Sequence, residues 1–136
     1  MREILFRGQY DKDMWIEGNP IVTNDGTFIY FGNGHAYWNN AEQCMQVENL
    51  LKVEPETVGQ FTGLLDRNES KIFEGDIIVF GESKPHKICM SNGAWLARNI
   101  IPNNYHYYGV TLGCIQQGEI KIIGNIHDNP ELLEVK

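Results

Sequence analysis

The residues best suited to general acid–base chemistry are four carboxylates near the middle of the chain, Glu54, Glu56, Glu74 and Asp76. Such chemistry needs two carboxylates in surroundings of different polarity. Local roles explain these residues better. Glu56 follows Pro55 in an expected helical turn, where a negative charge is favoured. Glu74 and Asp76 flank Gly75 in an expected tight turn. The sequence therefore predicts no catalytic residue, and a hydrolase assembled from separated acidic loops is the weakest of our hypotheses.

Metal ligands and phosphate-binding loops are the next candidates for chemistry. Cys44, Cys89 and Cys114 form no Cys-x-x-Cys pair, and His86, three residues before Cys89, has no second close pair to complete a zinc site. The chain contains no Gly-x-Ser-x-Gly elbow and no Gly-Lys-Ser or Gly-Lys-Thr phosphate loop. We expect no metal, no cofactor and no disulfide framework.

Length and charge limit the remaining classes of function. The 136 residues suit one globular domain or two very small ones, and 18 acidic against 11 basic residues give a net charge of −7. That sign argues against a protein whose whole surface tracks a phosphate backbone. No apolar run approaches the roughly 20 residues of a membrane span, and the N-terminus has no signal-peptide pattern. We expect a cytoplasmic protein without membrane contact.

One region departs from this acidic balance. Residues 83–118 contain no Asp or Glu. The candidate partner-binding residues there are Lys84, Lys87, Arg98, Tyr105, Tyr107 and Tyr108. Cations beside aromatic rings can hold phosphates and stacked bases, or they can anchor a protein partner. The rings at 105–108 follow a loop signal and cannot all face inward, so some should be exposed.

The elements that must position these residues are strands. Segments of four to seven residues rich in Ile, Val, Phe, Tyr and Trp alternate with Gly and Asn turns, which is typical of an all-β protein. Asn24-Asp25-Gly26 predicts a hairpin over 21–31. Gly32-Asn33-Gly34 predicts a return into 35–38, and Ser91-Asn92-Gly93 predicts a hairpin joining 87–90 to 94–98. Further strands are expected at 77–80 and 119–126.

Two proline-led segments, 54–57 and 128–133, predict single helical turns because Pro suits the first helical position. Residues 40–52 fit either a short helix or a strand, and both interpretations stay open. Trp95 is expected to fill the core from its hairpin strand. The aromatic cluster assigned mainly to the core of the first half consists of Phe28, Tyr30, Phe31, Tyr37 and Trp38.

Several separated motifs carry a family resemblance. The stretch 55–64, Pro-Glu-Thr-Val-Gly-Gln-Phe-Thr-Gly-Leu, followed by Glu-Gly-Asp-Ile at 74–77, resembles the signature of the YopX-like phage and prophage protein family. The segments 2–8, 15–18 and 123–133 resemble the family's opening, second element and close. One departure is Asn68-Glu69-Ser70, because the family usually has Asn followed by Gly there. That difference puts the turn type in doubt and leaves the expected fold unchanged.

The resemblance implies a lineage more than a mechanism, because the family carries no assigned activity. It implies a mainly β fold in which an N-terminal β subdomain, 1–62, packs on a small SH3-like barrel, 63–136, the two behaving as one domain or as two. It also implies a phage or prophage accessory protein in the host cell. The leading hypothesis is a non-enzymatic binding module for a host or phage protein. The alternative is nucleic-acid binding through 83–118, and self-association into a homo-oligomer stays open because strand edges must be paired or covered.

Overall fold

The computed structural model describes residues 3–32, 36–99 and 108–133. Strands dominate these residues, and the only helical elements among them are three short 3-10 turns, so the all-β class is confirmed. The chain divides into two compact units. Residues 5–60 form one, called here the 5–60 unit, and residues 61–136 together with the first four residues form the other, called the 61–136 unit. The expected division into subdomains 1–62 and 63–136 stays a prediction.

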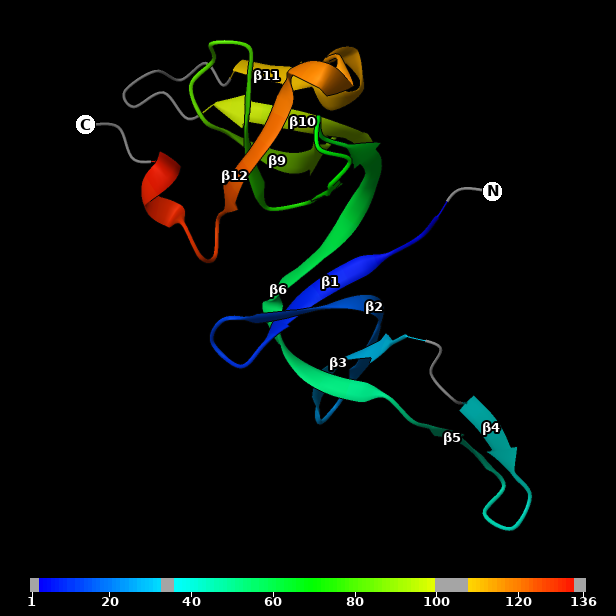
Figure 1. The fold of residues 1–136 in the computed structure, drawn as a ribbon. Helices are drawn as coiled ribbons and strands as arrows, with labels where there is room; N and C mark the ends of the chain where they lie inside the picture. Colours follow the sequence, from blue (N-terminus) through cyan, green and yellow to red (C-terminus); the bar gives the residue numbers. More distant parts are fainter. Residues whose placement is uncertain (1–2, 33–35, 100–107, 134–136) are drawn as a thin grey trace. The chain divides into compact units, whose positions relative to one another are not determined.

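Four antiparallel strands of the 5–60 unit pair in a closed ring (Figure 1). They are β1 (Phe6–Tyr10), β2 (Met14–Thr23), β3 (Gly26–Phe31) and β6 (Leu50–Leu65). Strand β2 pairs with β1 and β3, and β6 pairs first with β3 and then with β1. Each strand therefore has a neighbour on both sides, which removes open sheet edges. The predicted hairpin over 21–31 is confirmed, with Thr23 opposite Gly26.

The helical turn predicted at 54–57 is wrong, because this segment is a bulge in β6. The pairing with β1 jumps from Glu54 opposite Gln9 to Gly59 opposite Arg7. The backbone N–H of Gln9 donates to Thr57 Oγ1 at 2.8 Å, and the same hydroxyl donates to the Glu54 carbonyl at 2.6 Å. A proline cannot donate to a regular strand ladder, so it is tolerated at such a bulge.

Two further strands of this unit form a separate hairpin, β4 (Ala36–Asn39) with β5 (Cys44–Val47). The predicted pairing of 35–38 with 27–31 is wrong, because β3 lies between β2 and β6. Residues 33–35 of the expected turn lie outside the described residues. The open question at 40–52 resolves as a turn followed by strand, since β5 and the start of β6 occupy most of it.

The 61–136 unit is built around a five-stranded antiparallel sheet in the order β11-β10-β9-β8-β12. Its elements are β7 (Lys71–Phe73), β8 (Asp76–Phe80), β9 (His86–Ser91), β10 (Ala94–Asn99), β11 (Tyr108–Thr111), η1 (Leu112–Cys114), η2 (Gln117–Glu119), β12 (Ile120–Asn125) and η3 (Pro130–Leu133). Strand β7 pairs with the end of β6. The predicted helical turn at 128–133 and the strands at 77–80 and 119–126 are confirmed by η3, β8 and β12. The SH3-like barrel stays a prediction.

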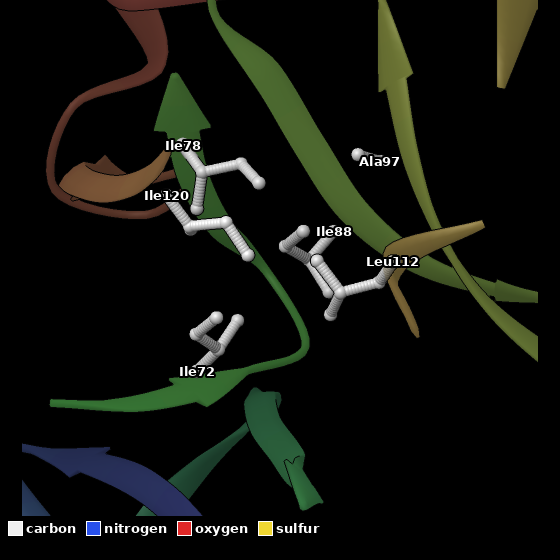
Figure 2. Close-up of a cluster of buried hydrophobic side chains, with 6 residues drawn as sticks. All are labelled: Ile72, Ile78, Ile88, Ala97, Leu112 and Ile120. Carbon is white, nitrogen blue, oxygen red and sulfur yellow. The ribbon is translucent and has the colours of Figure 1, made fainter. Parts of the chain in front are cut away.

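Aliphatic side chains from most of these elements form the core of the 61–136 unit. Figure 2 shows the cluster, which consists of Ile72, Ile78, Ile88, Ala97, Leu112 and Ile120, each no more than 2 % exposed. Trp95 packs against this cluster, as expected from its hairpin strand. Burial of this kind supplies most of the driving force for folding. Within the described residues, no helix is long and apolar enough to cross a bilayer.

Candidate partner-binding surfaces

The predicted cationic residues lie on the 61–136 unit. The predicted hairpin around Asn92 is confirmed, and its two-residue turn has positive φ at both central positions, as a type I′ turn requires. This register sets Lys87 directly opposite Arg98. Their sequence neighbours Ile88 and Ala97 are buried in the core, so the two cations lie on the other face of the sheet.

The structure brings the other candidate partner-binding residues together only in part. Lys84 is exposed in the loop between β8 and β9, where its carbonyl oxygen lies 2.6 Å from Nδ1 of the buried His86. The backbone of Tyr108 pairs with Asn99, next to the Arg98 position. Tyr105 and Tyr107 lie outside the described residues. Lys87 and Arg98 are both half-buried, and Nε of Arg98 is fully buried, so this surface is less open than its sequence suggests.

The buried carboxylates of this unit serve its fold. Asp76, 2 % exposed, accepts the Phe73 N–H at 2.8 Å, and Gly75 beside it has a φ of +90°, which confirms the predicted turn. Asp66, also 2 % exposed, ties a loop to β12: Oδ1 accepts the N–H groups of Asn68 and Ser70 at 2.8 and 2.9 Å, and Oδ2 accepts that of Ile122 at 3.3 Å. These bonds satisfy both buried carboxylates and tie the loops around them to the sheet.

A crevice of about 380 Å³ lies in the 5–60 unit beside the β1–β2 turn. Its charged lining comes from Asp11, Lys52 and Glu54. All three side chains are exposed to solvent, where water screens their charges.

Trp38, the most exposed aromatic side chain among the described residues, was expected in the core by the sequence argument. Trp38 in β4 lies opposite Met45 in β5, and their exposed fractions are 52 % and 56 %. Residues directly opposite each other share one face of a hairpin. In the described part of the chain, β4 and β5 pair with no third strand. The two side chains therefore form an apolar patch, called here the Trp38–Met45 patch, on a hairpin without sheet neighbours.

The core assignment of the first aromatic cluster is corrected by these exposures. Tyr37 is 40 % exposed and Trp38 52 %, whereas Phe28, Tyr30 and Phe31 are half-buried. On the face opposite the patch, the Tyr37 hydroxyl donates to Gln46 Oε1 at 2.8 Å. The signal that could have revealed the hairpin is Asn39, whose side-chain oxygen accepts the N–H groups of Ala41 and Glu42 and so closes the turn.

Comparison with known proteins supports the fold and the lineage. The structure is similar to the crystal structure of protein EF1440 from Enterococcus faecalis, with a TM-score of 0.62 and 22 % identity over 98 % of this chain and all of that chain. No curated protein matches the sequence. The family described as YopX protein matches residues 6–134, nearly the whole length. The family expectation drawn from the separated motifs is thereby confirmed, and the chain belongs to the YopX protein family.

Proposed function

We propose that this protein is a non-enzymatic binding module whose partner is another protein. The observation that carries the proposal is the Trp38–Met45 patch, which leaves a tryptophan and a methionine half-exposed on a two-stranded hairpin. Tryptophan is among the residues that contribute most to protein interfaces, and methionine is enriched there. A hairpin alone is marginally stable in water, so its exposed apolar face has more to gain from a partner than from solvent. Following its family resemblance, we propose a phage or prophage accessory role in the host cytoplasm.

Affinity capture of the tagged full-length chain from nuclease-treated host lysate tests this function. The test variant is Trp38→Ala with Met45→Ala. The matched control is Met14→Ala with Val22→Ala, which removes two apolar side chains of β2 that are 51 % and 79 % exposed. We expect a protein retained by the parent chain and by the control and lost from the test variant. Equal recovery by all three chains would contradict the use of this hairpin.

Nucleic-acid binding is the second candidate, and it is favoured by one specific observation. Lys87 and Arg98 lie directly opposite each other, which places two positive charges on one face of the β9–β10 hairpin. Two neighbouring cations of this kind suit a phosphate group. The candidate partner-binding residues of the 61–136 unit would then contact phosphates and bases.

Titration with labelled single-stranded DNA at increasing salt tests this second candidate. Binding through phosphates should weaken steeply as salt rises and should weaken again in Lys87→Gln. Lys12→Gln, an exposed lysine in the β1–β2 turn, is the control. A flat salt response, or no binding at low salt, would remove nucleic acid from the candidates.

A further inference from the structure

The charge around the Trp38–Met45 patch indicates which kind of protein would bind it. Residues 13–51 include no Lys or Arg, and they carry five carboxylates, Asp13, Glu17, Asp25, Glu42 and Glu48. The 5–60 unit as a whole has eight carboxylates and three Lys or Arg residues, a difference of −5 out of the chain's −7. The hairpin therefore belongs to a strongly acidic part of the molecule.

Two of these carboxylates lie on the hairpin or directly beside it. Glu42, in the β4–β5 turn, accepts a hydrogen bond from Gln46 Nε2 at 3.2 Å, and the Cys44 thiol lies within 3.9 Å of the same Glu42 oxygen. Glu48 follows β5 directly and is exposed. Cys44 and Gln46 alternate with Met45 along β5, so their bonds hold the Glu42 carboxylate toward the hairpin face opposite the Trp38–Met45 patch. The hairpin and the residue that follows it thus carry two negative charges and no Lys or Arg.

We infer that the Trp38–Met45 patch docks on a basic protein surface, one in which an apolar pocket is bordered by Lys or Arg. This inference rests on the proposed function and specifies its partner. Opposite charges around an apolar anchor raise the rate of encounter and reject wrong partners. A second copy of this chain would bring Glu42 and Glu48 of both copies together, and nucleic acid or an anionic membrane would meet the same negative charges.

Peptide probes of defined charge test the inference with the full-length chain. The first probe is a labelled amphipathic peptide of Leu and Lys, and the second is the same peptide with every Lys replaced by Glu. Binding is followed by fluorescence anisotropy at low salt. We expect the Leu/Lys peptide to bind and the Leu/Glu peptide not to bind. Trp38→Ala with Met45→Ala should weaken binding at least about tenfold, whereas Met14→Ala with Val22→Ala should leave it unchanged.

A charge-matched pair of variants separates local recognition from general attraction to an acidic protein. Glu42→Gln with Glu48→Gln and Asp13→Asn with Asp25→Asn remove the same number of charges from exposed sites of the same unit. We expect the first pair to weaken Leu/Lys binding about fivefold more than the second, because only its charges lie on the hairpin or directly after it. Equal effects of the two pairs, or no binding of the Leu/Lys peptide, would overturn the inference.

The remaining outcomes distinguish this inference from the function on which it rests. If the Leu/Glu peptide binds as tightly and depends on Trp38, protein binding through the hairpin survives and the basic partner is wrong. If sedimentation shows that the parent chain self-associates and the Trp38→Ala, Met45→Ala variant does not, the occupant is a second copy and the inference is again overturned. If neither peptide binding nor lysate capture responds to the hairpin variant, both proposals are wrong.

Discussion

Two hairpins of this protein contain the same cross-strand pair, a tryptophan opposite a methionine, but the tryptophan packs against the core in one hairpin and is exposed in the other. In the β9–β10 hairpin Trp95 lies opposite Met90, and in the β4–β5 hairpin Trp38 lies opposite Met45. Trp95 packs against the aliphatic core and its indole Nε1 is buried. Trp38 is 52 % exposed.

The difference lies in the strands that flank each pair. Strands β9 and β10 are bordered by β8 and β11 in a five-stranded sheet, so one face of the hairpin covers the core. Among the described residues, β4 and β5 pair only with each other. A local Trp–Met pair therefore does not decide whether the tryptophan is buried. The neighbouring strands decide it, and a hairpin without them leaves its apolar face exposed to solvent.

The largest effect expected from this comparison is on the buried tryptophan. Trp95→Ala removes a large side chain that packs on the aliphatic core cluster, and we expect the free energy of unfolding to fall by about 3 kcal/mol. Denaturant unfolding followed by circular dichroism measures it. A loss below about 1 kcal/mol would mean that the two tryptophans are energetically alike and that the comparison fails.

The next effect concerns the hydrogen bonds by which Asp66 ties its loop to β12. Asp66→Asn replaces one acceptor oxygen with an NH₂ group that cannot accept the surrounding N–H donors, among them that of Ile122. We expect a loss of about 2 kcal/mol, typical of a buried polar group left unsatisfied. Asp13→Asn, an exposed carboxyl change, is the control and should stay within about 0.5 kcal/mol. Similar losses for both variants would contradict the structural role of Asp66.

Sequence reasoning succeeded where a structure depends on a few adjacent residues. The turn at Asn92-Gly93 requires positive φ at both residues, and the turn that follows Asn24-Asp25 requires it at Gly26, where φ is +136°, so both hairpins were predictable. The opposition of Lys87 and Arg98 follows directly from the two-residue turn between their strands. The prediction for the segment around Pro55 was wrong because proline suits both a helix start and a bulge. Pairing with β1, which is distant in the sequence, determines that a bulge forms.

The candidate site was harder to predict for the same reason. An alternating apolar strand such as 36–39 looks identical whether or not other strands flank it, so Trp38 was expected in the core. Exposure of the Trp38–Met45 patch depends on the pairings of β3, which lie outside the hairpin's own sequence. Burial of the Arg98 Nε likewise depends on packing that charge patterning does not reveal.

A smaller effect is expected in the loop Asn68-Glu69-Ser70, where the family resemblance leads us to expect Asn followed by Gly. Glu69 adopts a φ of +63°, in the left-handed region that glycine occupies without strain. We expect Glu69→Gly to raise the free energy of unfolding by about 0.5 kcal/mol, after allowance for the greater freedom of glycine in the unfolded chain. Glu69→Ala keeps a Cβ and should give no gain in thermal or denaturant unfolding. A gain of the same size in Glu69→Ala would show that removal of charge is the cause.

The smallest effect on stability is expected when the exposed tryptophan, Trp38, is replaced. Trp38→Ala removes a side chain that rests mostly in solvent, so we expect the free energy of unfolding to change by less than about 0.5 kcal/mol. The same denaturant experiment, run beside Trp95→Ala, measures both values under one condition. A loss comparable to that of Trp95→Ala would mean that Trp38 belongs to a core.

Hydroxyl-radical footprinting of the two tryptophans tests the central claim most directly, because mass spectrometry reports the oxidation of each residue in the same molecule. The full-length chain is labelled alone, at a concentration where sedimentation shows a monomer, and again with the Leu/Lys peptide. We predict that Trp38 oxidises several times faster than Trp95 in the free chain and becomes protected when the peptide binds, while Trp95 does not change. Equal protection of both tryptophans in the free monomer would contradict the claim that the Trp38–Met45 patch is an unoccupied binding surface.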